Sequence, residues 1–127
     1  RINMPYLNIT TNAPVNKRQK ETIECAISKA ILLIPKEKEE LLMVNFEDCA
    51  SLSLSGDFST PAAMIELRVH NVVIEMNEAE LLEKVMSLAT EVVSKVLDIC
   101  PDRIYCTMPA VPYWTAAGLE ILKGILK

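Results

Sequence analysis

Pro5 is the residue of this sequence with the most unusual chemistry, because it follows Met4 and opens the strand-like segment 6–12. An initiator methionine is normally removed before proline, and its loss would leave Pro5 with a free secondary amine. The α-amino group of an ordinary chain has a pKa of ~8, and burial in an apolar pocket lowers the pKa of an amine. A proline at the head of a buried strand is therefore predicted to act as a general base near neutral pH.

Residues 1–3 precede Met4, so the chain as given does not begin at Pro5. We interpret residues 1–4 as a remnant of an expression vector plus the initiator methionine, and residues 5–127 as one domain. While residues 1–4 are attached, the nitrogen of Pro5 belongs to an amide and is not basic. The alternative is that Pro5 only opens a strand, where its missing N–H costs nothing.

The rest of the sequence offers few groups for catalysis or metal binding. His70 is the only histidine, and no pattern pairs it with a serine or a cysteine for nucleophilic catalysis. The cysteines lack Cys-x-x-Cys spacing and a histidine at metal-ligand spacing; they are Cys25, Cys49, Cys100 and Cys106. We therefore expect free thiols in a reducing compartment, no metal site and no cofactor.

Composition and charge argue against several classes of partner. The chain has 127 residues, of which 50% are apolar, a net charge of −4 and a mean hydropathy of +0.22. It lacks a basic cluster interleaved with aromatic residues, which argues against nucleic acid. The longest apolar run, 30–35, is far shorter than the ~20 residues of a membrane span. We expect small-molecule or protein partners, self-association and a cytoplasmic location, with export without a signal peptide left open.

The spacing of apolar residues predicts the order strand, helix, strand, strand, helix, strand. These elements cover residues 6–11, 17–34, 41–46, 62–70, 78–100 and 103–108. Asn16 and Gln19 form a capping-box pattern before the first helix. The order predicts an α+β (α/β) fold, in which duplicated βαβ units form a four-stranded mixed sheet with both helices on one face.

One face of such a sheet would have no helix over it. Leu42, Val44 and Phe46 are too apolar for solvent, so we expect them on that face, packed against another subunit. After a loop at 112–114, the apolar segment 119–126 predicts a short helix docked on the body or on a neighbour.

Three segments carry a resemblance to a known family. They are the proline-strand-Thr-Asn opening 4–12, the segment 54–61 containing Leu-Ser-Gly and Ser-Thr-Pro, and Pro-Asp-Arg-Ile-Tyr at 101–105. Over residues 4–114 the sequence resembles the macrophage migration inhibitory factor and D-dopachrome tautomerase family of the tautomerase superfamily. The resemblance implies a homotrimer whose sheets surround a central channel, with sites between subunits around the N-terminal proline.

The same resemblance implies an isomerase for keto–enol tautomerisation of small aromatic keto acids of the phenylpyruvate and dopachrome type. Pro5 would be the catalytic base, and Lys36, His70, Tyr105 and Thr107 would bind the substrate. We expect this activity to be weak and to be masked while residues 1–4 remain. The Cys-x-x-Cys found in part of the family is missing, so oxidoreductase activity is not implied.

The sequence departs from the family at several of these positions. Ile34 stands where the family carries a lysine, and Lys36 is the nearest cation to replace it. Thr107 replaces an asparagine, while Tyr105 matches the aromatic residue that the family takes from the neighbouring subunit. His70 lies in the segment that would donate a backbone hydrogen bond to the substrate. The alternative is that His70, a lone histidine at a strand end, lies at the surface.

Two other functions stay open. The departures at Ile34 and Thr107 favour a catalytically degenerate, cytokine-like protein that acts by binding a cell-surface receptor or another partner. The other alternative is a small α/β scaffold unrelated to this family. Trp114 is the aromatic residue that we would place as the wall of the site.

Overall fold

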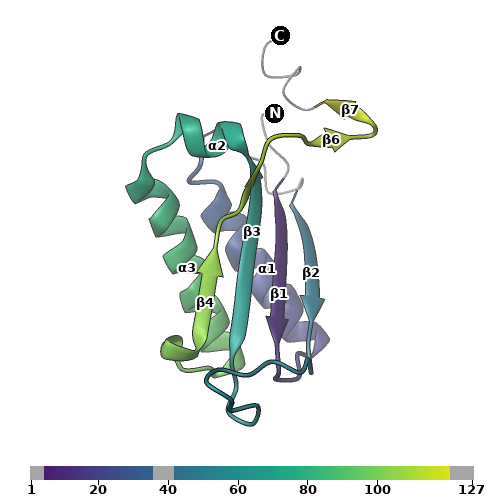
Figure 1. Cartoon of the computed structure of the whole chain (residues 1–127), viewed down its shortest axis with the longest axis vertical. Coiled ribbons are helices and arrows are strands. Elements are labelled where there is room, and N and C mark those ends of the chain that lie inside the picture. Colours follow the sequence, from purple (N-terminus) through teal and green to yellow (C-terminus); the bar gives the residue numbers. More distant parts are fainter. Residues whose placement is uncertain (1–4, 36–41, 121–127) are drawn as a thin grey trace.

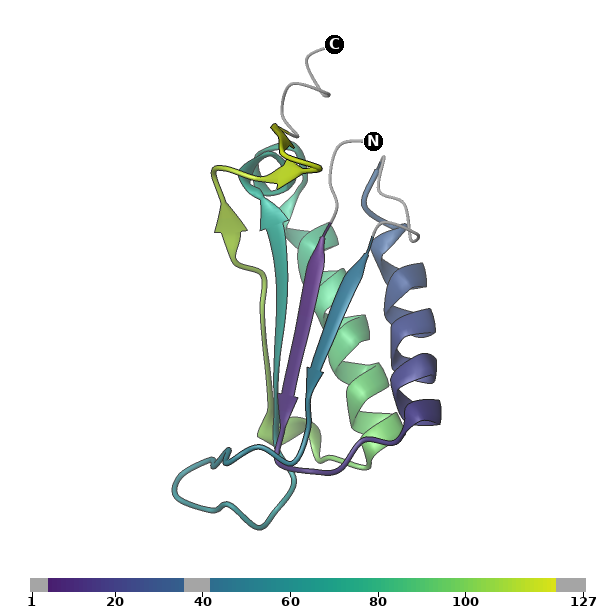
Figure 2. The ribbon, with the colours of Figure 1, turned by 90° about the vertical axis from the view of Figure 1, so that its right-hand side faces the viewer.

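A mixed sheet with two long helices on one face makes up the body of the molecule (Figures 1 and 2). The computed structural model describes residues 5–35 and 42–120. The elements of the body are β1 (Tyr6–Thr11), α1 (Lys17–Ile31), β2 (Met43–Glu47), β3 (Ala63–His70), α3 (Ala79–Leu97) and β4 (Ile104–Thr107). The shorter elements are α2 (Asn71–Met76), the 3-10 turn η2 (Pro101–Arg103), β5 (Ala110–Val111), β6 (Thr115–Ala116) and β7 (Leu119–Glu120).

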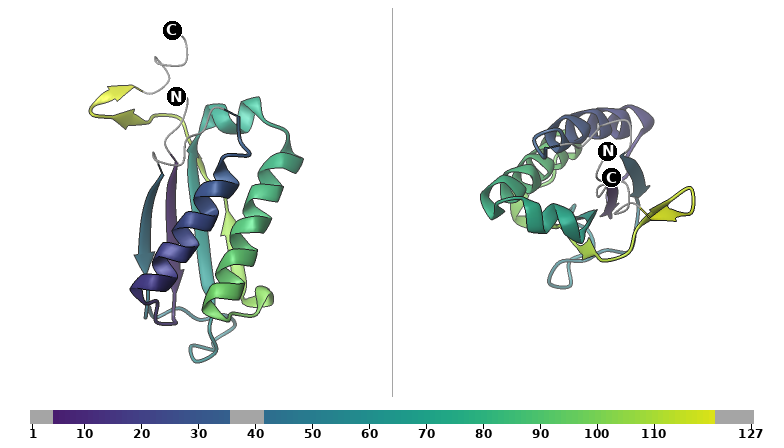
Figure 3. Two further views of the ribbon diagram at one scale, coloured as in Figure 1. Left: turned by 180° about the vertical axis from the view of Figure 1, so that it is seen from behind. Right: turned by 90° about the horizontal axis from the view of Figure 1, so that it is seen from above.

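The duplicated βαβ plan is confirmed. Strands lie in the order β2-β1-β3-β4, with β1 parallel to β2 and β3 parallel to β4. The two halves meet where β1 and β3 pair antiparallel, and α1 packs against α3 over one sheet face (Figure 3). The fold class predicted from the order of the elements is the observed one.

The helix limits follow local sequence signals. Asn16 and Gln19 form the predicted capping box at the start of α1, with each side chain bonded to the other's backbone N–H. Helix α2 was not predicted, because its residues 72–74 are β-branched and favour strands. It begins where the side chain of His70 accepts a hydrogen bond from the backbone of Val72.

The core lies between the sheet and the two helices. Leu7, Ile9 and Ile65 contribute fully buried side chains from β1 and β3, and Ile27 and Val93 do so from α1 and α3. Each such side chain stabilises the fold by about 1.5–3 kcal/mol relative to an exposed one. The core therefore fixes the β1–β3 register, on which the site depends.

The prediction for β2 was wrong about its two faces. Val44 pairs with Leu7 and Phe46 pairs with Ile9, so both lie on the helix-covered face and pack against the core. Leu42, which was assigned to the uncovered face with them, packs against the core as well. Strand β2 is an alternating strand, and alternate residues point to opposite faces. The residues that β2 places on the uncovered face are Met43, Asn45 and Glu47.

The short helix predicted near the end of the chain is absent from residues 115–120, and residues 121–127 lie outside the described part. Strands β6 and β7 form a hairpin there (Figures 1 and 3). Its two turn residues, Ala117 and Gly118, have φ of 54° and 73°. Positive φ at both central residues is the requirement of a type I′ turn, which favours a hairpin. Within the described residues, no helix combines the length and apolar character needed to cross a membrane.

Candidate functional site

Pro5 lies at the head of an interior strand. It is buried and directly precedes β1, which has β2 on one side and β3 on the other. Its carbonyl accepts a hydrogen bond from the backbone nitrogen of Met43 at 3.1 Å. Proline fits here because it stands before the paired part of the strand. The predicted position of Pro5 is thus confirmed, and its role as a base stays a prediction.

His70 is buried at the end of β3, next to this site. The register pairs Tyr6 with Arg68, and His70 lies two residues beyond Arg68, at the end of the sheet where Pro5 precedes Tyr6. The imidazole is 3% exposed, which excludes the surface position considered from the sequence. Its Nδ1 accepts a hydrogen bond from Val72 N at 3.0 Å. Its Nε2 is buried with no hydrogen-bond partner in the part of the chain that the structure describes.

Arg68 is a cation close to Pro5 that the sequence did not reveal. It is directly opposite Tyr6, and its guanidinium lies 5.5 Å from the centre of the Tyr6 ring. Within residues 5–35 and 42–120, its one ion pair is with the Glu66 carboxylate, at 3.9 Å. Half-exposed pairs of this length contribute little to stability. Only the β1–β3 register brings Arg68 to this end of β1, and the sequence does not contain that register.

Three other positions singled out from the sequence are Ile34, Lys36 and Trp114. Ile34 is 2% exposed and belongs to the core, so an apolar side chain stands where the family carries its lysine. Lys36 lies outside the described residues. Trp114 is half-buried in the segment between β5 and β6, and its place as the aromatic wall stays a prediction.

Tyr105 and Thr107 are far from Pro5 within one chain. Tyr105 pairs with Met64, four positions along β3 from Arg68. At roughly 3.3 Å per residue, this separation is about 13 Å. Thr107 pairs with Glu66, two positions from Arg68 or about 7 Å, and β3 lies between its strand and β1. Both side chains are exposed, with Tyr105 at 60%. A single chain therefore does not bring these two residues to Pro5.

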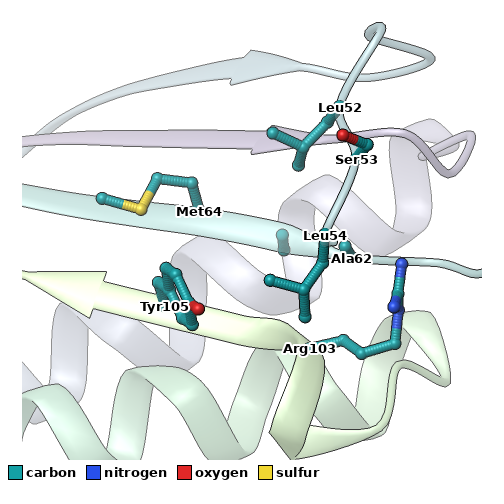
Figure 4. A pocket seen from close by; sticks show the side chains of 8 residues that line it. Leu52, Ser53, Leu54, Ala62, Met64, Arg103 and Tyr105 are labelled. Carbon is teal, nitrogen blue, oxygen red and sulfur yellow. The ribbon is translucent and has the colours of Figure 1, made fainter. Parts of the chain in front are cut away.

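An apolar pocket of about 140 Å³ lies at the other end of the sheet, beside Tyr105 (Figure 4). Leu52, Leu54 and Met64 line it, and Arg103 forms part of its wall. The Arg103 guanidinium donates to the carbonyl oxygens of residues 57, 60 and 61 at 2.9 to 3.1 Å. These hydrogen bonds hold residues 57–61 in place. The volume is below the ~300 Å³ of a typical ligand site, so this pocket is not our candidate site.

The cysteines do not add a reactive group to the site. All four are free, and Cys106 is the only one that is half-buried. Burial raises the pKa of the Cys106 thiol to about 11, against a smaller opposing effect of Thr90. The thiolate that acts as a nucleophile is therefore scarce at neutral pH.

Comparison with known proteins supports the fold and gives no close relative. No family model matches the chain, and no curated protein is similar to it in sequence. MIF2 of Leishmania major has a similar structure, with a TM-score of 0.79, 17% identity, and coverage of 92% of this chain and 97% of that one. The macrophage migration inhibitory factor homologue of Prochlorococcus marinus has a TM-score of 0.76 and 21% identity, and the match covers 91% of this chain and 98% of that one.

A fused 4-OT protein, described as a wild type symmetric trimer, is also similar. Its TM-score is 0.78 at 15% identity, and the match covers 94% of this chain and 98% of that one. These identities show the fold alone, and the fold agrees with the resemblance carried by segments 4–12, 54–61 and 101–105. The chain therefore has the fold of the macrophage migration inhibitory factor homologues and of the fused 4-OT protein.

Proposed function

We propose that this chain, when it begins at Pro5, is a keto–enol tautomerase of small aromatic α-keto acids. The observation that carries the proposal is the buried position of Pro5 at the head of β1, in a fold shared with macrophage migration inhibitory factor homologues. A secondary amine held there has the low-dielectric surroundings that lower the pKa of an amine toward neutrality. Such an amine is a suitable general base for a proton next to a carbonyl.

The proposed enzyme is a homotrimer, because one chain does not complete the site. Along the sheet, Tyr105 lies about 13 Å and Thr107 about 7 Å from the level of Tyr6, the residue after Pro5, and both point to the uncovered face. A neighbouring copy would supply them to Pro5 and would also cover that face. The fused 4-OT protein described as a symmetric trimer supports this assembly. The four free cysteines support a reducing, cytoplasmic location.

A second candidate is a cytokine-like binding protein that keeps the trimer and lacks turnover. The observation that favours it is Ile34, whose buried side chain leaves the family's lysine position without a cation. Its ligand would be a receptor or another protein. This candidate predicts partner binding that does not change when Pro5 is substituted.

The test is tautomerisation of phenylpyruvate by three proteins: the chain that begins at Pro5, the chain with residues 1–4 attached, and the Pro5→Gly variant that begins at residue 5. Light scattering checks each for a trimer. The proposal expects turnover by the first protein and a large loss in the other two. Three trimers without turnover would favour the binding protein, and equal turnover by all three would exclude Pro5 as the base.

A further inference from the structure

The imidazole of His70 is buried with one nitrogen satisfied and the other without a partner. Nδ1 accepts the backbone N–H of Val72 at 3.0 Å and so caps helix α2. Nε2 has no hydrogen-bond partner within residues 5–35 and 42–120, although the side chain is 3% exposed. Buried polar groups without partners are rare in folded proteins, because each costs stability. An orphaned Nε2 beside a candidate site therefore indicates a missing partner.

The hydrogen bond at Nδ1 fixes what Nε2 can do. A ring nitrogen that accepts an N–H carries no proton itself. The ring is then neutral, with its proton on Nε2, and Nε2 is a donor. The missing partner is therefore an acceptor, such as a carbonyl or enolate oxygen.

The strand register places this donor beside the substrate position of the proposed enzyme. Tyr6 is opposite Arg68, and β3 continues two residues beyond that pair to His70, at the end of the sheet where Pro5 precedes Tyr6. When the chain begins at Pro5, a substrate bound at the free nitrogen lies just beyond the start of β1. Neighbouring strands are only ~4.8 Å apart, so this position is on the side of His70.

We propose that the Nε2–H group of His70 donates a hydrogen bond to the carbonyl oxygen of the substrate, an inference that rests on the proposed function. The nitrogen of Pro5 takes a proton from the carbon next to the carbonyl, so a C–H bond breaks and an N–H bond forms. The electron pair moves to the oxygen and gives an enolate. Pro5 then returns the proton to that oxygen, which completes an isomerisation without any other reactant.

This role compensates for Ile34, which leaves the family's lysine position without a donor. A neutral imidazole N–H can polarise a carbonyl while a separate base moves the proton. The bond strengthens as charge develops on the oxygen, so its loss should lower kcat more than it changes KM. His70 is thus the electrophilic partner of the Pro5 base.

The substitution His70→Asn separates this role from the capping of α2. Asparagine is an excellent N-cap, so the variant keeps the acceptor for Val72 and loses the distant N–H. We expect a folded trimer with a kcat for phenylpyruvate lower by on the order of a hundredfold. His70→Gln restores an N–H at similar reach and should recover part of the loss. Unchanged kcat in His70→Asn, with turnover that still requires Pro5, would overturn the inference and leave the proposed function intact.

A readout independent of turnover comes from ¹⁵N NMR, because His70 is the only histidine of the chain. The expected spectrum is that of a ring protonated at Nε2. Cinnamate, a planar aromatic carboxylate that cannot tautomerise, should shift the Nε2–H resonance in the chain that begins at Pro5. A ring protonated at Nδ1 would overturn the inference, as would a missing shift when cinnamate inhibits turnover. A shift without any turnover would keep His70 as a ligand contact and reject the enzyme.

Discussion

Asn12 and Arg103 donate hydrogen bonds to the same carbonyl oxygen, that of Thr60, at 3.0 and 2.9 Å. Asn12 follows β1 and Arg103 precedes β4, so the loop at 52–62 is held from both halves of the fold. Asn12 also binds the carbonyl of Phe58 and the backbone N of Ala62. Asn12 and Arg103, which both belong to the segments of the family resemblance, therefore position a loop.

Asn12→Ala should lower the free energy of unfolding by about 1–3 kcal/mol, because it leaves loop carbonyls and an N–H without partners. Urea unfolding measures the change. Arg103→Lys keeps the charge and loses the planar donor group, so it should also destabilise. Because both residues bind Thr60, the double variant should differ from the sum of the two single changes. Strict additivity would mean that the shared carbonyl does not couple them.

The loop should also depend on pH through Asp57. Its carboxylate accepts from the hydroxyl and backbone N–H of Thr60 and from the N–H of Ser59, and these bonds lower its pKa from 3.8 to about 2. A lowered pKa in the folded state stabilises the fold fully above the unfolded value and loses this contribution as the pH falls toward about 2. The difference in unfolding free energy between the original chain and Asp57→Asn should shrink across that range. A constant difference would contradict this assignment.

Neighbouring residues on opposite faces of β3 should separate folding from assembly. Ile65 is fully buried in the core, and Ile65→Ala should destabilise each subunit by about 2–5 kcal/mol. Met64 lies on the uncovered face beside Tyr105, so Met64→Ala should cost a single subunit about 1 kcal/mol or less and weaken the trimer. Urea unfolding and sedimentation velocity distinguish the two effects. An unchanged trimer in Met64→Ala would mean that subunits do not meet on this face.

Mixed trimers should show that each site is shared between subunits. The Pro5→Gly and Tyr105→Ala variants should both be weakly active alone. When their subunits are refolded together at equal amounts, about a quarter of the sites combine an intact Pro5 with an intact Tyr105 from the neighbour. Turnover of phenylpyruvate should rise accordingly. Turnover equal to the mean of the separate variants would place both residues in one subunit's site.

Thiol labelling should distinguish the cysteines. Cys25, Cys49 and Cys100 are exposed, whereas burial raises the pKa of Cys106 to about 11. Iodoacetamide reacts with the thiolate, so near neutral pH it should modify the three exposed residues first. Mass spectrometry of the folded protein checks this, and the unfolded chain is the control in which Cys106 reacts as well. Rapid labelling of Cys106 in the folded protein would contradict its burial.

The elements of the fold were largely predictable because each has a local signal. The alternation in β1 and the capping box of Asn16 and Gln19 depend on residues a few positions apart, and both appear as predicted. Helix α2 and the β6–β7 hairpin were missed. In α2 the tertiary context overrides the strand preference of its β-branched residues. In the hairpin, Ala117 adopts a positive φ, which an alanine in the sequence does not predict.

The site was predictable only where it depends on one strand. Pro5 precedes an alternating segment, so its place at a strand head follows from sequence. The burial of His70 and the approach of Arg68 to Tyr6 depend on how β1 pairs with β3, which lies more than fifty residues away. The same limit explains the faces of Val44 and Phe46, which were assigned before the partner of β2 was known.

The antiparallel pairing of β1 with β3, called here the β1–β3 seam, also has a consequence for how the chain folds. Each half on its own is one helix over two parallel strands, and a sheet of two strands is at best marginally stable in water. The residues that seal the core, Leu7 and Ile9 against Leu67 and Ile65, come from different halves. Neither half is therefore expected to persist as an intermediate, and folding must wait for a contact between distant segments. Chains whose contacts are this non-local fold slowly for their size, so the seam sets the folding rate as well as the site.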